Sequence, residues 1–370
     1  MRQFIPVATP ALLGNEKAYV MDCLASTWIS SHGKYIERFE SAFAEFCGVK
    51  HALSCCNGTV ALHLALLALD VGPGDEVIVP TLTYVATANA VTYCGARPVF
   101  VDSEPETWNM NPALIEEKIT PRTKGIIAVH LYGHPVDMDP ILHFAHKHRL
   151  FVIEDAAEAH GAGYKGRRIG SIGDINIFSF FGNKIITTGE GGMVVTNDEG
   201  LANRVRQLKG QGMDPNRRYW FPIVGYNYRM TNVAAAIGVA QLEKADWHIA
   251  RRREIAAEYH ERLKDLPGIT FQPEKSWAHS VHWMTSAVLN EQCRYSSTSV
   301  MRSLAEANIE TRPFFCPMHK LPMYSDFAHG QRFPVADYLA DRGFNLPSSA
   351  TLGDDDISYI CSQMTQILSQ

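Results

Sequence analysis

Leu150-Phe-Val-Ile-Glu154 and Ile175-Asn-Ile-Phe-Ser-Phe180 are short, nearly continuous apolar runs, rich in β-branched and aromatic residues. Similar runs lie at residues 76–80, 98–102, 125–130 and 192–196. Such strands, separated by segments of helical length, are typical of a mostly parallel sheet that helices cover on both faces. The sequence therefore predicts an α/β domain.

Helical patterns are clearest at residues 57–69, 111–119, 138–148 and 201–208, and Asn57 is a suitable N-cap for the first. After Met230 a long helix is expected from about Thr231 to Leu263, with a break near residues 245–248. Two β segments and two further helices follow. We expect two domains, a large α/β domain over residues 1–240 and a smaller α+β domain over residues 241–370, because single cores stop growing at roughly 250–300 residues.

Composition and charge exclude several classes of protein. The net charge of -5 comes from interspersed acids and bases, so no basic surface is expected to hold a nucleic acid. The longest apolar run, residues 60–69, is too short to span a bilayer, and the first residues do not resemble a signal peptide. The eight cysteines lack CxxC spacing and are interpreted as reduced thiols. We expect a cytoplasmic protein without nucleic-acid or membrane partners.

Two side chains with complementary chemistry follow neighbouring strands of the predicted sheet. Asp155 ends the run that begins at Leu150, and Lys184 lies in the loop after the run that begins at Ile175. Ligands of open α/β sheets bind beyond the carboxyl ends of the strands. A lysine and an acid there suit pyridoxal phosphate, whose aldehyde needs an amine for a Schiff base and whose ring nitrogen needs a carboxylate to stay protonated. A released Lys184 amine could also act as a base.

A phosphate site is expected where the helix after Ser54-Cys-Cys-Asn57 begins. Gly58 and Thr59 would offer backbone N–H groups and a hydroxyl to an anion, and Ser179 could add another hydroxyl. Tyr84 lies just past a strand, where its ring could stack on a pyridine. Taken alone, the start of the helix is better explained as an ordinary capped helix, and Tyr84 is equally explained as a loop aromatic that closes the core. Together with the lysine and the aspartate they favour a cofactor site.

These motifs resemble those of the DegT/DnrJ/EryC/StrS family of sugar aminotransferases over essentially the whole chain. The resemblance rests on segments spread along the sequence, at residues 27–31, 57–63, 154–158, 179–192, 210–220, 225–231 and 311–313. It implies a fold type I transferase that depends on pyridoxal phosphate, with a mostly parallel seven-stranded sheet, a smaller C-terminal domain and no metal.

The resemblance also implies roles for individual residues. Lys184 would hold the cofactor, Asp155 would bind its ring nitrogen, and Tyr84 would stack on the ring. The phosphate would bind to Gly58, Thr59, Ser179 and, from the neighbouring subunit of a homodimer, Asn227. Active sites would be shared across the dimer, which could pair into a tetramer. Many members have glutamine where this chain has Glu158, so the usual amide hydrogen bond near the cofactor hydroxyl cannot be carried over. The candidate substrate ligands are Trp28, Ser30, Arg217, Arg218, Tyr219, Trp220, Arg229, Arg312 and His319.

The implied reaction transfers the amino group of L-glutamate to C4 of GDP-4-keto-6-deoxymannose, for a sugar of the O-antigen of lipopolysaccharide. Relatives that deoxygenate the sugar have histidine in place of Lys184, so amination is favoured. Three alternatives stay open. The acceptor could be a dTDP- or UDP-linked 4-keto-6-deoxy sugar, the protein could be a non-catalytic regulator that keeps the cofactor fold, or a metal could bind to His130, His134 and His160.

Overall fold

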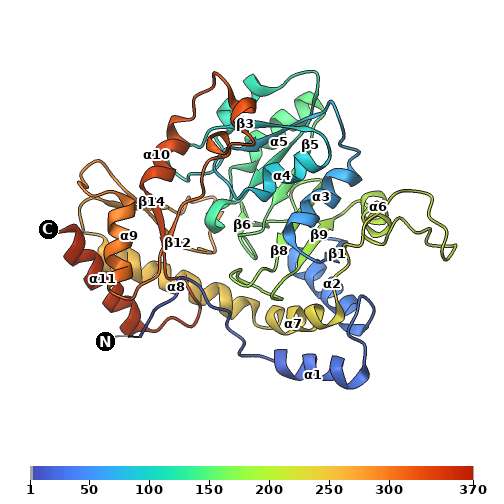
Figure 1. Ribbon diagram of the computed structural model, residues 1–370, viewed down its shortest axis with the longest axis horizontal. Coiled ribbons are helices and arrows are strands. Elements are labelled where there is room, and N and C mark those ends of the chain that lie inside the picture. Colours follow the sequence, from blue (N-terminus) through green and yellow to red (C-terminus); the bar gives the residue numbers. More distant parts are fainter. Residues whose placement is uncertain (1–2, 370) are drawn as a thin grey trace.

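The structure is a computed structural model that describes residues 3–369. Its centre is a seven-stranded sheet (Figure 1), and strand β9 is antiparallel to both of its neighbours while all other adjacent strands are parallel. This confirms the predicted mostly parallel α/β sheet. In spatial order the strands are β1 (His51–Cys55), β9 (Gly192–Thr196), β8 (Ile175–Ser179), β5 (Phe151–Asp155), β4 (Thr123–Val129), β2 (Glu76–Pro80) and β3 (Arg97–Val101).

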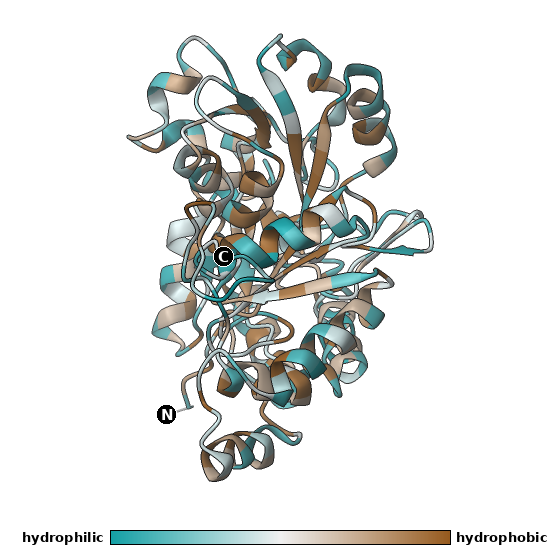
Figure 2. Cartoon of the chain, turned by 90° about the vertical axis from the view of Figure 1, so that its right-hand side faces the viewer, coloured by the Kyte–Doolittle hydropathy of each residue, from teal (hydrophilic) through white to brown (hydrophobic). Residues whose placement is uncertain are grey.

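Helices cover both faces of this sheet. Helix α2 (Lys34–Cys47) buries Phe39 and Phe43 against Phe178 and Phe180 of the β8 segment, with ring centroids 4.9–5.2 Å apart. Ser179, between these two phenylalanines, faces the N-terminus of helix α3 (Gly58–Ala68) instead. Because alternate side chains of a strand point to opposite faces, α2 and α3 lie on opposite sides of the sheet. Strand β8 is buried along its whole length, and Figure 2 shows that strands in the interior are largely hydrophobic.

The remaining elements of the first part of the chain surround these layers. They are α1 (Glu16–Ser26), α4 (Ala86–Tyr93), α5 (Met138–His148), α6 (Glu199–Lys209), α7 (Asn232–Leu242) and the 3-10 turns Pro112–Leu114, Glu116–Lys118 and Leu131–Gly133. The predicted long helix is two helices, α7 and α8 (Ala245–Leu263), so the expected break is present a few residues early. The helices predicted at 57–69, 138–148 and 201–208 are confirmed as α3, α5 and α6.

Two sequence predictions about local structure were wrong. Residues 111–119 form two 3-10 turns, Pro112–Leu114 and Glu116–Lys118, in place of one α-helix. So short a segment gains few intrahelical hydrogen bonds to offset the cost of helix nucleation. Strand β1 was missed, because His51-Ala-Leu-Ser-Cys55 lacks β-branched residues and gains its strand conformation by pairing with β9.

The C-terminal part contains a four-stranded antiparallel sheet in the order β10 (Ile269–Phe271), β12 (Thr285–Leu289), β14 (Gly343–Leu346) and β13 (Arg312–Pro313). Its helices are α9 (Ser297–Glu306), α10 (Pro334–Arg342) and α11 (Asp354–Leu368), one more than predicted, with 3-10 turns at Met318–Lys320 and Ser325–Ala328. Ile5 packs in an apolar cluster with residues of α8, α9 and α11, and it pairs with Ile309. The N-terminal segment therefore lies against this part (Figure 1). The division at residues 240 and 241 stays a prediction.

A small three-stranded sheet joins the two parts of the chain. It pairs β11 (Ala278–His279) with the hairpin formed by β6 (Gly163–Tyr164) and β7 (Arg167–Arg168). Within residues 3–369 no helix is long and apolar enough to cross a membrane.

Candidate active site

A pocket of about 430 Å³ opens at the carboxyl ends of β5 and β8. Such an edge is where open α/β sheets bind their ligands. Its walls bring together most of the residues that the sequence predicted for the cofactor, and one of those predicted for the substrate: Gly58, Thr59, Tyr84, Asp155, Glu158, Ser179, Lys184 and Arg312.

Lys184 lies in the loop that follows β8, and only 11% of its side chain is exposed. The Nζ atom lies 3.7 Å from the centroid of the Trp283 ring and 3.5 Å from Oε1 of Glu158. Burial lowers the pKa of Lys184, and the negative charges of Glu158 and Asp155 oppose this effect. The amine is therefore more readily deprotonated than an exposed lysine, as a nucleophile or base requires.

Asp155 is the last residue of β5 and is buried. Its Oδ2 accepts a hydrogen bond from the Thr87 hydroxyl at 2.8 Å, and its Oδ1 accepts one from the Ala157 N–H at 3.3 Å. Burial raises the pKa of Asp155, while the Thr87 hydroxyl and the Lys184 charge lower it. A carboxylate held in this way at the floor of a pocket suits the protonated nitrogen of a heterocycle.

Glu158 places a second buried carboxylate beside the lysine. Its Oε2 accepts a hydrogen bond from the backbone N–H of Tyr132 at 2.8 Å. Tyr132 has φ 56° and ψ 15°, a left-handed conformation that is uncommon outside glycine and is found at functional sites. Burial raises the pKa of Glu158, and the Lys184 charge opposes this. One lysine thus lies between two buried acids.

The N-terminus of α3 forms a cradle for an anion. The Asn57 side chain caps the helix by accepting from the Val60 N–H at 3.0 Å, and Gly58 and Thr59 of the first turn line the pocket. The first N–H groups of a helix have no partner within the helix and can bind an anion. A Cβ atom on Gly58 would lie 2.7 Å from the Cβ of Ser179, so residue 58 must be glycine for the helix to lie this close to β8. Helix N-termini of this kind bind phosphate. The residues present therefore fit pyridoxal phosphate.

Tyr84 lines the pocket mouth and is 56% exposed, with its ring centroid 5.7 Å from that of Phe315. Its stacking on a cofactor ring stays a prediction. Asn183 also lines the pocket, and its Oδ1 is buried without a partner among the described residues. An unpaired buried acceptor costs free energy, which a ligand with a hydrogen-bond donor would recover.

Several predicted substrate ligands do not line this pocket. His319 is held elsewhere, since its Nδ1 lies 2.8 Å from Thr81 Oγ1 and its Nε2 lies 3.0 Å from Asp337 Oδ1. Residues 211–225 form a loop that projects beside α6 (Figure 1), in which the Arg217 guanidinium lies 4.3 Å from the centroid of the Trp220 ring. The other predicted substrate ligands outside the pocket are Trp28, Ser30, Arg218, Tyr219 and Arg229. Asn227, which was predicted for the cofactor phosphate, does not line the pocket either.

The structure adds pocket residues that the sequence did not single out for this site. The most informative are Thr87, Tyr132, Trp283, Phe315 and Asn345. A signal existed for one of them, because Tyr132 lies between His130 and His134 in the segment considered for a metal. The Trp283 indole N–H donates to the backbone oxygen of Asn183 at 2.8 Å and so anchors the loop that carries the lysine.

The three histidines considered for a metal make separate contacts. His130 Nε2 lies 3.1 Å from Glu154 Oε2, while its Nδ1 accepts from the Val136 N–H. His134 bonds to the Pro135 oxygen, and His160 packs against Phe178 and Phe180. Within residues 3–369 no group of three or more histidine, cysteine or acidic side chains could hold a metal ion.

Known proteins resemble the chain over nearly all of its length. It is 54% identical to the GDP-perosamine synthase of Caulobacter vibrioides, over 98% of each chain, and 52% identical to the GDP-perosamine synthase of Escherichia coli O157:H7, over 99% of each. Among solved structures, that of DesV from S. venezuelae is 34% identical and superposes with a TM-score of 0.93 over 100% of both chains.

A family model also matches nearly the whole chain, over residues 11–365. The matched region contains both buried acids, the lysine and the α3 cradle. The chain therefore belongs to the DegT/DnrJ/EryC1/StrS aminotransferase family.

Proposed function

We propose that this protein is a pyridoxal-phosphate-dependent aminotransferase that moves the amino group of L-glutamate to C4 of GDP-4-keto-6-deoxy-D-mannose, giving GDP-perosamine. The observation that carries the proposal is Lys184 held between two buried acids in a chain 54% identical to a GDP-perosamine synthase. When bound, pyridoxal phosphate supplies an electron sink that stabilises negative charge at the donor's Cα. The product would serve O-antigen synthesis.

Each residue of the pocket has a distinct proposed role. The α3 cradle with Thr59 and Ser179 would hold the cofactor phosphate, and Tyr84 would cover one face of its ring. Asp155 would keep the ring nitrogen protonated from the pocket floor. Lys184 would bind the aldehyde carbon and, once the donor has displaced it, would take the proton from the donor's Cα with its Nζ.

Arg312 is the proposed anion ligand at the mouth of the pocket. Its side chain is 42% exposed, and its guanidinium lies 3.8 Å from the Glu310 carboxylate, too far for a strong hydrogen bond. A guanidinium group in this position suits the carboxylate of an amino donor or the pyrophosphate of a nucleotide sugar.

The proposal is tested by mass spectrometry of the products formed by purified holoenzyme with glutamate. GDP-4-keto-6-deoxymannose, dTDP-4-keto-6-deoxyglucose and the UDP-linked sugar are offered in separate reactions. We expect an amino sugar in the GDP reaction alone. An amino sugar in the dTDP or UDP reaction alone would keep the chemistry and refute the substrate, and no product with any acceptor would refute the function.

We expect the Glu158→Gln variant to shift the acidic limb of the kcat–pH profile to lower pH. The amide keeps an oxygen for the Tyr132 N–H, but it removes the negative charge that raises the pKa of Lys184. With that charge gone, burial lowers the pKa of Lys184 further, and the amine stays deprotonated at lower pH. An unchanged limb, or a shift to higher pH, would show that the Glu158 charge does not act on Lys184.

We further propose a homodimer in which Asn227 acts on the neighbouring subunit's cofactor phosphate. Asn227 is exposed, does not line the pocket of its own chain, and is held by the Arg229 guanidinium at 3.1 Å. Large exposed apolar side chains nearby in sequence, Tyr219, Trp220 and Phe221, are typical of a protein–protein interface. Mass photometry should find dimers or tetramers. Any monomer present should have no aminotransferase activity.

Mixed dimers test the role of Asn227 directly. Each single variant, Lys184→Ala and Asn227→Ala, should have low activity as a homodimer. A heterodimer of the two should regain about half of the wild-type activity, because a shared site would combine both defects in one site and leave the other intact. If Asn227 acted on its own subunit, neither site of the heterodimer would be intact and no activity would return.

A further inference from the structure

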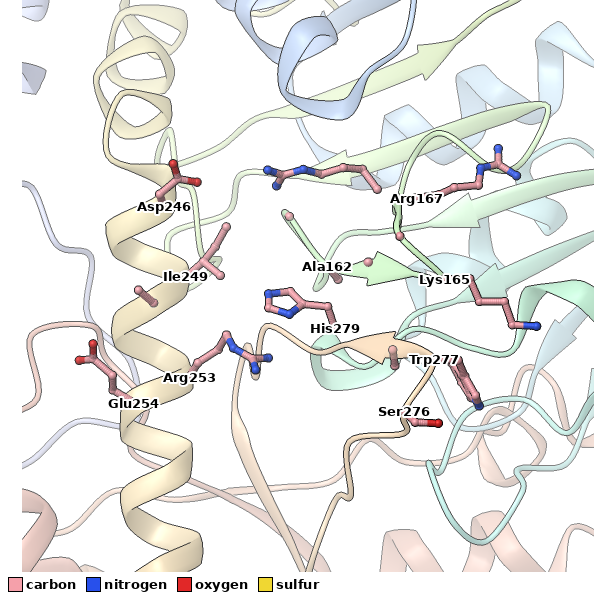
Figure 3. A pocket seen from close by; sticks show the side chains of 16 residues that line it. Ala162, Lys165, Arg167, Asp246, Ile249, Arg253, Glu254, Ser276, Trp277 and His279 are labelled. Carbon is pink, nitrogen blue, oxygen red and sulfur yellow. The ribbon is translucent and has the colours of Figure 1, made fainter.

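A second pocket, of about 910 Å³, lies between the β6–β7 hairpin, helix α8 and the segment around β11 (Figure 3). We call it the hairpin pocket. None of the residues that line it lines the active-site pocket, so the two are separate. Its volume is within the range of pockets that bind small molecules, roughly 300–1,000 Å³.

Nitrogen-bearing side chains, two of them guanidinium groups, converge on the hairpin pocket from three elements. Arg168 comes from β7, Arg253 from α8 and His279 from β11, and Figure 3 shows Arg253 and His279 projecting into the same space. Burial lowers the pKa of His279. The positive charges of Arg253 and Arg168 lower this pKa further, and the negative charge of Glu274 opposes them. Both guanidinium groups therefore lie close enough to the imidazole to act on it.

The guanidinium of Arg168 is available to a ligand. No acidic side chain among residues 3–369 forms an ion pair with it, and it makes no side-chain hydrogen bond there. Its Cζ lies 4.8 Å from the centroid of the Phe46 ring, and its Nη1 would lie 3.1 Å from a Cβ on residue 161. The side chain thus lies over the Phe46 ring while remaining exposed, and a guanidinium without a carboxylate partner can donate to a phosphate.

Arg253 is partly engaged. Its Nη1 donates to Glu274 at 3.0 Å and to the Ser280 backbone oxygen, which fixes the guanidinium beside β11. None of the hydrogen bonds found in the described part of the chain uses its Nη2. Arg253 can therefore donate to a ligand without breaking the contacts that position it.

Two acids also line the hairpin pocket, and they do not cancel its positive wall. Glu254 is ion-paired to Arg251 at 3.0 Å, outside the lining. Asp246 lies in the first turn of α8, where the helix dipole stabilises its charge, and it offers an acceptor to hydroxyl or amino groups of a ligand. The pocket thus suits a ligand with an anionic end and a hydrogen-bonding end.

We propose that the hairpin pocket binds a phosphate-bearing small molecule, with the phosphate held by Arg168, Arg253 and His279. The phosphate could belong to a free polyphosphate or to a nucleotide. The proposal rests on this pocket alone and does not depend on the reaction at Lys184.

Calorimetric titration of the holoenzyme tests the proposal, because bound cofactor already fills the α3 cradle. Inorganic pyrophosphate should bind at one site per chain that Arg168→Ala and His279→Ala each weaken by at least about tenfold. Arg302→Ala, which removes an exposed arginine from α9, and Arg312→Ala, which removes the arginine of the active-site pocket, should leave this binding unchanged. No binding by the wild-type protein, or equal binding by all variants, would overturn the proposal.

Competition by GDP then identifies the source of the phosphate. If GDP displaces pyrophosphate from the wild-type holoenzyme, the site accepts nucleotides, and the competing affinity should fall with Arg168→Ala. If GDP binds without displacing pyrophosphate, GDP occupies the active site and the hairpin pocket takes a free polyphosphate.

Discussion

The Lys184→Ala variant should lose turnover by about 10³-fold or more with glutamate and the keto sugar. Proton transfer by a positioned base is worth about 10²–10⁴-fold, and this residue would also bind the cofactor's aldehyde. Among the described residues no other lysine lines the pocket, so no second amine there could replace Lys184. The measurement is single-turnover formation of the amino sugar, with the absorbance of the bound cofactor followed in parallel.

Lys244→Ala is the matched control, since it removes an exposed lysine at the start of α8. It should keep full activity, and both variants should give the circular dichroism spectrum of the wild type. The lysine-dependent absorbance band should be absent from Lys184→Ala alone. Turnover within tenfold of wild type would contradict the central role of Lys184. If the wild-type protein bound its ligands but showed no turnover, the result would instead favour the non-catalytic regulator.

The Asp155→Asn variant should lower kcat by about 10²–10³-fold, the scale seen when one group that stabilises developing charge is removed. Asparagine has nearly the same shape, and its single oxygen can still accept from the Ala157 N–H, while its amide nitrogen can donate to the Thr87 hydroxyl oxygen. It cannot keep a ring nitrogen protonated, so the electron sink is weakened. Pre-steady-state rates of donor deamination report this step separately from sugar binding.

Thermal stability distinguishes this chemical role from a structural one. Burial raises the pKa of Asp155, which means that the folded protein bears a cost for its charge. The melting temperature of Asp155→Asn apoprotein should therefore stay at or above that of the wild type, while activity falls. Asp326→Asn, at an exposed 3-10 turn, should change neither quantity. A large fall in melting temperature would assign Asp155 a structural role.

Strand and helix positions could largely be predicted because their signals are local. Met138–His148 and Glu76–Pro80 have the expected bounds, since an apolar period and flanking breakers specify them within one window of sequence. The two errors have the opposite cause. Strand β1 depends on pairing with β9, which lies far along the chain, and residues 111–119 have helical spacing over a segment too short to sustain an α-helix.

The sequence by itself determined the α/β sheet, the α3 cradle and the pair Asp155 and Lys184, because strand ends on one edge of a parallel sheet must lie together. Only the tertiary structure decided that Lys184 lies between two buried acids and against the Trp283 ring, and that Tyr132 takes a left-handed conformation. Only the tertiary structure, too, assembled the hairpin pocket from β7, α8 and β11. Such contacts join residues far apart in the chain, and burial alters their pKa values only after those residues have packed.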